Sequence, residues 1–194
     1  MRVLTILGSP RPNGNTSHVL SWVEQSLRSS AHSVDRITLI EHVLGPCREC
    51  GMCRKPENPD LCHAPTDGAN AIFNKMIRAD AIIIASPLFC WGFPSHLKAL
   101  LDRLYCVVGD CDHNPEYATK LEGKPIGLLV TCAGPEEGNA ELMIRSYYAL
   151  VRFLKAIPAG HVLYPFFRTT QDLTQQDRNR ATEFALRMAA QCTM

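Results

Sequence analysis

Short apolar segments alternate with longer amphipathic segments along the chain, and this alternation limits the folds that the chain can adopt. Five short segments are rich in apolar residues, as β-strands are: 3–7, 36–40, 81–85, 125–131 and 161–166. Five longer segments place apolar residues at helical spacing: 16–29, 69–78, 94–104, 136–156 and 174–191. Strands that alternate with helices predict a parallel sheet with right-handed crossovers and helices on both faces.

The chain length suits one such unit. Its 194 residues, of which 46% are hydrophobic, can fill one core and leave little room for a second. The segment at about 46–68, rich in proline and cysteine, is the one irregular insertion. We therefore expect a single domain over residues 1–194 that carries a Cys-rich insertion.

Charge and hydrophobicity argue against two classes of partner. Twenty basic residues against nineteen acidic ones give a net charge of +1, unlike the basic footprint of a nucleic-acid-binding protein. The longest apolar runs, such as 81–85, are too short to span a bilayer. The apolar N-terminal run ends at Gly8, too early for a signal peptide, so we expect a cytoplasmic protein.

The loop after the first strand segment has the composition of an anion site. Residues 8–17 read GSPRPNGNTS and lead into a helix, so hydroxyls, an amide side chain and backbone N–H groups gather at a helix N-terminus. The loop has neither a Gly-Lys-Ser/Thr sequence nor the Gly-x-Gly-x-x-Gly fingerprint of dinucleotide-binding proteins. It is typical of a site for a monoester phosphate, with Arg11 as the nearby cation. The alternative is a capped turn that binds no ligand.

This loop, together with residues 79–103 (ADAIIIASPLFCWGFPSHLKALLDR), resembles the NADPH-dependent FMN reductase family. The resemblance covers nearly the whole chain. It implies an α/β, flavodoxin-like fold, in which a doubly wound five-stranded parallel sheet of order 2-1-3-4-5 carries helices on both faces. It also implies FMN as the cofactor and NAD(P)H as the electron donor.

The resemblance assigns cofactor-binding roles to three loops. The residues expected to hold the FMN phosphate are Ser9, Arg11, Asn15, Thr16 and Ser17; those expected to line the isoalloxazine ring are Pro87, Leu88, Phe89, Cys90, Trp91 and Gly92; and those expected on the second flavin-side loop are Thr131 and Gly134. A flat, apolar ring needs aromatic or aliphatic walls and close backbone approach. The alternative for Phe89, Trp91 and Phe93 is ordinary core or interface packing.

The resemblance also implies the reaction. In related enzymes a hydride passes from a nicotinamide to N5 of the flavin, and flavin, quinone or another small molecule accepts the electrons. The flavin carries the chemistry, so we expect no catalytic side chain, and the seven histidines are scattered. Related proteins are dimers or tetramers, so we expect a homodimer or a homotetramer.

Nine cysteines are a high count for an intracellular domain of this size. An odd number, without a secretory signal, argues against a disulfide scaffold. Cys47, Cys50 and Cys53 form a C-x2-C-x2-C motif, and Cys62 follows after eight residues. Such spacing allows three thiolates to meet one iron–sulfur cluster, with a fourth returning from a loop.

This motif resembles that of the iron–sulfur flavoproteins, in which the corresponding cysteines hold a 4Fe-4S cluster. The alternative function is therefore transfer of single electrons between a ferredoxin-like partner, the cluster and FMN. The gap before Cys62 is longer than the compact spacing of those proteins. The same cysteines are also compatible with zinc, held by three thiolates plus Cys62 or His63, or with reduced thiols that bind no metal.

Overall fold

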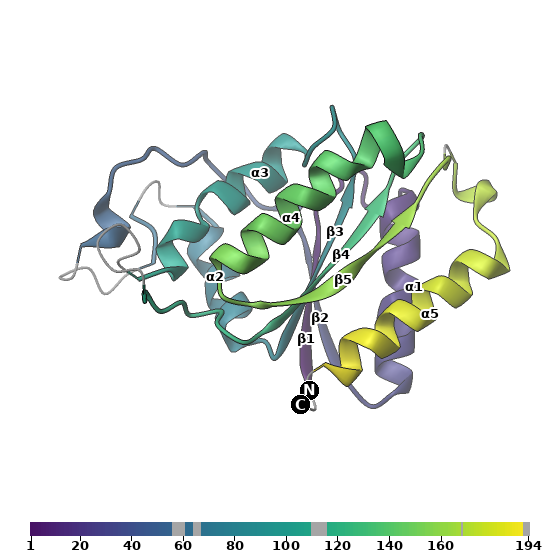
Figure 1. Ribbon diagram of the computed structural model, residues 1–194, viewed down its shortest axis with the longest axis horizontal. Coiled ribbons are helices and arrows are strands. Elements are labelled where there is room, and N and C mark those ends of the chain that lie inside the picture. The colour runs from purple at the N-terminus through teal and green to yellow at the C-terminus, as the bar shows by residue number, and fades with distance from the viewer. Residues whose placement is uncertain (56–60, 64–66, 110–115, 168, 192–194) are drawn as a thin grey trace.

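The sheet has five parallel strands in the order β2-β1-β3-β4-β5, which confirms the predicted flavodoxin-like topology (Figure 1). The computed structural model describes residues 1–55, 61–63, 67–109, 116–167 and 169–191. The strands are β1 (Arg2–Leu7), β2 (Ser33–Thr38), β3 (Ala81–Pro87), β4 (Pro125–Thr131) and β5 (Ile157–Tyr164).

The central strands are apolar because the sheet is covered on both faces. Every residue of β3 and of β4 is buried, whereas buried and exposed positions are mixed along the edge strands β2 and β5. A continuous run such as Ala81 to Ala85 therefore fits the middle of a parallel sheet, where neither face meets water.

Two layers of helices enclose the sheet. Helices α1 (Asn15–Ser29) and α5 (Gln175–Ala190) cover one face, and α2 (Ala69–Arg78), α3 (Ser95–Asp102) and α4 (Glu141–Phe153) cover the other (Figure 1). Each layer has its own apolar core. Phe73 and Leu97 belong to the core under α2, α3 and α4, and Val23 and Phe184 belong to the core under α1 and α5. Within the described ranges, none of these helices has the length and apolarity needed to cross a membrane.

The predicted bounds of both edge strands were wrong by several residues. The second strand begins at Ser33 rather than at 36, and Leu39–Glu41 form a 3-10 turn. The fifth begins at Ile157 rather than at 161, although it contains Pro158 and Gly160. An edge strand tolerates proline.

A bulge accounts for Gly160. Ile126 pairs with Pro158 and Leu128 pairs with His161, so two residues of β5 lie opposite Gly127 alone. Gly160 has φ 81°, a conformation that glycine adopts without strain.

Two predicted helices were also too long. The helix expected over 136–156 begins at Glu141, because Glu137 is extended and Gly138 has φ 65°. The helix expected over 94–104 ends at Asp102 and is followed by a 3-10 turn at Leu104–Val107.

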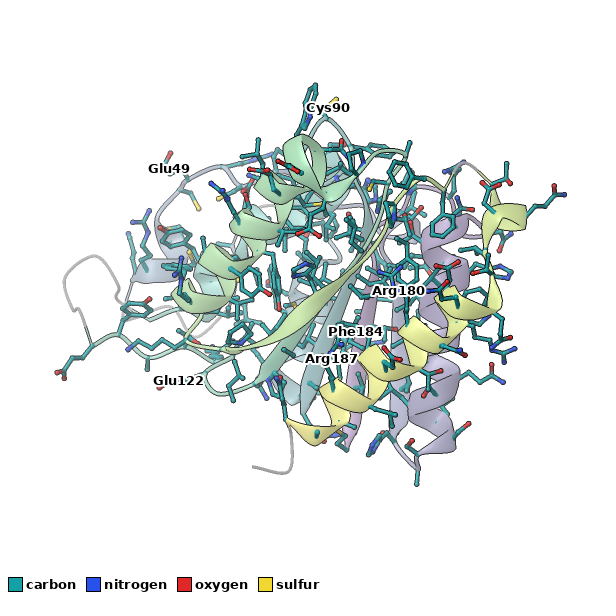
Figure 2. The ribbon with its side chains drawn as sticks, turned by 45° about the vertical axis from the view of Figure 1, so that its right-hand side comes forward. Glu49, Cys90, Glu122, Arg180, Phe184 and Arg187 are labelled. Atoms are coloured by element: carbon teal, nitrogen blue, oxygen red, sulfur yellow. The ribbon has the colours of Figure 1, made fainter. Side chains whose placement is uncertain are left out.

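Gly127 allows α5 to pack closely on the sheet, and its replacement is expected to destabilise the fold. A Cβ at this position would lie 2.6 Å from Met188 Sδ and 2.8 Å from Phe184 Cζ. Figure 2 shows Phe184 on the side of α5 that faces the sheet. We expect Gly127→Ala to lower the free energy of unfolding by about 1–3 kcal/mol, measured by urea denaturation. The loss should be smaller in a Met188→Ala background, and an unchanged stability of Gly127→Ala would contradict this packing.

Candidate functional site

The loop between β1 and α1 is a tight turn at the carboxyl edge of the sheet. The N–H of Gly8 donates to the carbonyl of Ala85 at 2.7 Å, so the loop starts against β3. A Cβ on Gly8 would lie 2.4 Å from Leu97 Cδ2, which shows how closely the backbone passes α3. The N–H of Arg11 then donates to Ser9 Oγ at 3.1 Å, and that of Gly14 donates to the Arg11 carbonyl at 3.0 Å.

The N-terminus of α1 offers uncompensated hydrogen-bond donors. The helix has no side-chain cap and no acidic residue in its first turn. The backbone N–H groups of Asn15, Thr16 and Ser17 have no hydrogen-bond partner within the described residues. All three residues are buried, as is Ser9, so four polar residues are gathered at this turn. Backbone donors together with the helix dipole suit this turn to binding an anion, so it is the candidate anion site of the fold.

A buried hydrogen bond joins this turn to the end of β4. Thr16 Oγ1 lies 2.7 Å from Thr131 Oγ1, although the two residues are 115 positions apart. The Thr131 carbonyl in turn accepts a hydrogen bond of 2.9 Å from the N–H of Leu88. The structure thus brings together the three loops that the sequence singled out.

The loop after β3 projects from the molecule as a two-residue turn. Phe89 and Gly92 exchange two backbone hydrogen bonds, of 3.0 and 2.9 Å. Between them Cys90 and Trp91 have φ of 45° and 61°, values that non-glycine residues rarely adopt. Figure 2 shows Cys90 at the tip of the molecule.

The exposure of this loop excludes core packing for two of its aromatic residues. Phe89 is 47% exposed and Trp91 is 59% exposed, so neither is a core residue. Phe93 differs, because it is half-buried and packs against the core under α3. The first two therefore offer free apolar surface beside the anion site, as a wall for a flat ring would.

The loop after β4 is more self-contained than the sequence suggested. The Cys132 thiol donates to the Gly134 carbonyl at 3.0 Å, and burial raises the pKa of this thiol, which is therefore neutral. A Cβ on Gly134 would lie 3.0 Å from Asn139 Nδ2. The polar contact that the structure describes for Gly134 stays within its own loop, so only Thr131 of this pair reaches the α1 turn.

The anion site has a further wall that the sequence did not reveal. An open groove is lined by Pro10, Arg11, Asn13 and Asn15 on one side and by Thr169 and Thr170 on the other. Arg11 is exposed in this groove, so its charge is available to a ligand. No local pattern marks the two threonines, because they lie far along the sequence from the first loop and only the folded chain brings them beside it. The donor set fits the phosphate of FMN, and the loop after β3 fits its ring.

The four predicted metal ligands lie around one hollow of about 380 Å³. Cys47 and Cys50 are exposed, and Cys53 and Cys62 are half-buried. Burial, and next the neighbouring Cys62, raise the pKa of Cys53. In the part of the chain that the structure describes, no three Cys, His, Asp or Glu side chains are arranged to hold a metal ion. The donor set fits an iron–sulfur cluster chemically, but the thiols do not converge here as the spacing predicted.

Cys62 is the cysteine that the body of the fold holds in place. Asn70 of α2 makes two hydrogen bonds to its backbone. The Cys62 N–H donates to Asn70 Oδ1, and Asn70 Nδ2 donates to the Cys62 carbonyl, both at 3.0 Å. Arg103 Nε donates to Cys62 Sγ at 3.3 Å. The same guanidinium donates to Asp67 Oδ2 at 2.6 Å and to the Gly45 carbonyl at 3.2 Å. Arg103 therefore fastens both ends of the Cys-rich insertion to the end of α3.

Asp67 should make this anchoring dependent on pH. Burial alone would raise its pKa, but hydrogen bonds from Arg103, Gly45 N–H and Ala69 N–H outweigh burial and hold the pKa below its ordinary value. The ion pair of Asp67 therefore stabilises the fold fully at any pH above the ordinary pKa of an aspartate, which is about 4. This stabilisation is lost as the pH falls through the lower pKa of the folded state.

We expect Asp67→Asn to cost about 3–5 kcal/mol at pH 7, because it leaves the buried Arg103 uncompensated. Urea unfolding between pH 7 and about pH 3 should show that the difference in free energy of unfolding between wild type and Asp67→Asn becomes smaller toward the acidic end. The matched control is Asp35→Asn, which removes an exposed ion pair with Lys75 and should change stability little. An advantage of wild type over Asp67→Asn that does not depend on pH would contradict the assignment.

Comparison with known proteins agrees with this geometry. A family model described as NADPH-dependent FMN reductase matches residues 1–168. An iron-sulfur flavoprotein of Methanosarcina thermophila is 28% identical over 148 residues, which cover 76% of this chain and 71% of the relative. The FMN reductase (NADPH) of Escherichia coli is 29% identical over 169 residues, which cover 86% of this chain and 72% of the relative. The solved structure of an azoreductase from Bacillus anthracis shares the fold, with a TM-score of 0.73 and 18% identity over all of both chains. The match over residues 1–168 shows that this chain belongs to the NADPH-dependent FMN reductase family.

Proposed function

We propose that this chain is an FMN-dependent NAD(P)H oxidoreductase that reduces flavin, a quinone or another small acceptor. The observation that carries the proposal is the uncapped, polar first turn of α1, joined to the end of β4 by the bond between Thr16 and Thr131. When bound, FMN supplies a ring that takes up a hydride at N5 from a nicotinamide and passes the electrons on.

Each loop has a separate task in this proposal. The backbone N–H groups of residues 15–17 hold the phosphate, and Arg11 adds a positive charge at the open side of the groove. Thr131 links the phosphate turn to the ring side. Phe89 and Trp91 cover the apolar ring and exclude water from it. No side chain of the described site needs to act as an acid or a base.

Anaerobic mixing with NADH or NADPH tests the proposal. The FMN-loaded protein should lose its oxidised flavin absorbance, and that absorbance should return when a quinone is added, because the quinone takes up the two electrons. A flavin that stays oxidised with both nucleotides would contradict the proposed activity. Failure of the protein to bind FMN would contradict the site itself.

Thr16→Val should weaken FMN binding, because it removes a buried hydroxyl from the phosphate turn and breaks the bond to Thr131. We expect the dissociation constant, measured by quenching of FMN fluorescence, to rise about 10–100-fold. Thr182→Val is the matched control, because that threonine is exposed on α5 and, among the described residues, its hydroxyl bonds the Arg178 carbonyl of its own helix. Unchanged affinity in Thr16→Val would remove this residue from the site.

A second candidate function rests on the cysteine hollow. Four thiols and three guanidinium groups, those of Arg48, Arg54 and Arg103, line the same 380 Å³ space. The carboxylates of Glu49 and Asp102 line it too, and the excess of guanidinium groups over carboxylates suits an anionic iron–sulfur cluster. The Methanosarcina relative is an iron-sulfur flavoprotein by name. In this second proposal the chain passes single electrons between a ferredoxin-like protein, the cluster and FMN.

Iron and sulfide analysis after anaerobic purification separates the two functions. Electron transfer through a cluster requires about four iron and four sulfide per chain, with or without reconstitution. Cys62→Ser should lose them, whereas Cys90→Ser should keep them, because Cys90 lies on the loop after β3 and outside the hollow. Iron far below this level after reconstitution would contradict the second function, and stoichiometric zinc would indicate a structural metal instead.

A further inference from the structure

A buried carboxylate lies behind the first turn of α1. Glu24, on the third turn of this helix, is 4% exposed and faces the sheet. Thr5 of β1 donates its hydroxyl to Glu24 Oε1 at 2.6 Å. Two cations share the carboxylate: Arg36 Nε lies 3.0 Å from Oε1, and Arg28 NH1 lies 3.6 Å from Oε2. A buried charge of this kind is stable only when it is paired and hydrogen-bonded.

One of the two arginines also reaches the phosphate turn. Arg36 NH2 donates to the carbonyl of Ser17 at 3.0 Å, and Ser21 Oγ donates to the same oxygen at 2.9 Å. Ser17 is the last of the three residues whose N–H groups are free for an anion. The guanidinium of Arg36 is thus ion-paired with Glu24 at Nε, where it makes no hydrogen bond within the described residues, and it donates its hydrogen bond to the turn from NH2.

Arg28 provides an internal comparison. It pairs with the same carboxylate, but its side chain is 51% exposed and its other contact is the carbonyl of Val34, at 3.5 Å. It therefore compensates the charge of Glu24 without touching the turn. The difference between the two arginines separates charge compensation from positioning.

We propose that Arg36 is a positioning residue that fixes the first turn of α1 for the flavin phosphate, so that the site selects FMN over riboflavin. A hydrogen-bond donor contributes fully to binding only when neighbouring residues hold it in the geometry that the ligand needs. Arg36 fastens the turn to β2, a neighbouring element of the sheet, from the side opposite to Thr131. The inference rests on the proposed function, because it assumes that this turn receives the phosphate of FMN.

The test compares FMN with riboflavin, which has the same ring and no phosphate. In Arg36→Met we expect the dissociation constant of FMN to rise about tenfold, and that of riboflavin to stay within about twofold of wild type. Arg28→Met, the matched control, should leave both constants unchanged. Because Arg36→Met leaves Glu24 with one cation fewer, the double variant Glu24→Gln/Arg36→Met is measured beside it. The double variant should be more stable than Arg36→Met and should show the same loss of selectivity for FMN over riboflavin.

The outcomes distinguish this inference from the proposed function. Equal weakening of FMN and riboflavin in Arg36→Met would show a general structural role and overturn the inference. FMN affinity equal to that of wild type would overturn it as well. Wild-type protein that binds both flavins equally well would instead show that the α1 turn is no phosphate site, and the proposed function would fail with it.

Discussion

Because all five strands run parallel, each connection between successive strands has to return along one face of the sheet, and the helices that do so bury β3 and β4 on both faces. All five strands then end at the same edge, and their loops meet there whatever their distance in the sequence. The hydrogen bond between Thr16 and Thr131 is a direct result of this constraint. The site thus depends on the parallel pairing of strands that contribute few of its side chains.

Local patterns in the sequence were sufficient for a parallel sheet with helices on both faces and for the first loop, whereas the strand order and the flavin-side loops were implied by the family resemblance. Strongly apolar β3 and β4 were placed within two residues of their true bounds. The edge strands were not, because buried and exposed positions are mixed along them and their composition is mixed as well. Thr16 and Thr131 were identified from the loops that carry them, but the bond between them follows from the fold.

The residues that the sequence did not reveal are those that act on distant partners. Arg103 holds Cys62 and Asp67 from the end of α3, and Arg36 holds Ser17 from β2. Arginines are common on the surfaces of proteins, and no spacing in the chain distinguishes these two from the rest. The convergence expected of the four cysteines depends in the same way on how the insertion folds. Asn70 and Arg103 hold Cys62 in place, whereas Cys47 and Cys50 are exposed.

The bulge in β5 has a consequence for encounters between copies of the chain. The outer side of an edge strand carries unpaired backbone groups on which a second strand can assemble, the first step toward ordered aggregates. Pro158 has no N–H to offer, and the extra residue at Ala159–Gly160 interrupts the regular register of the strand. The features that obscured this strand in the sequence therefore make its outer edge a poor template for β-sheet growth.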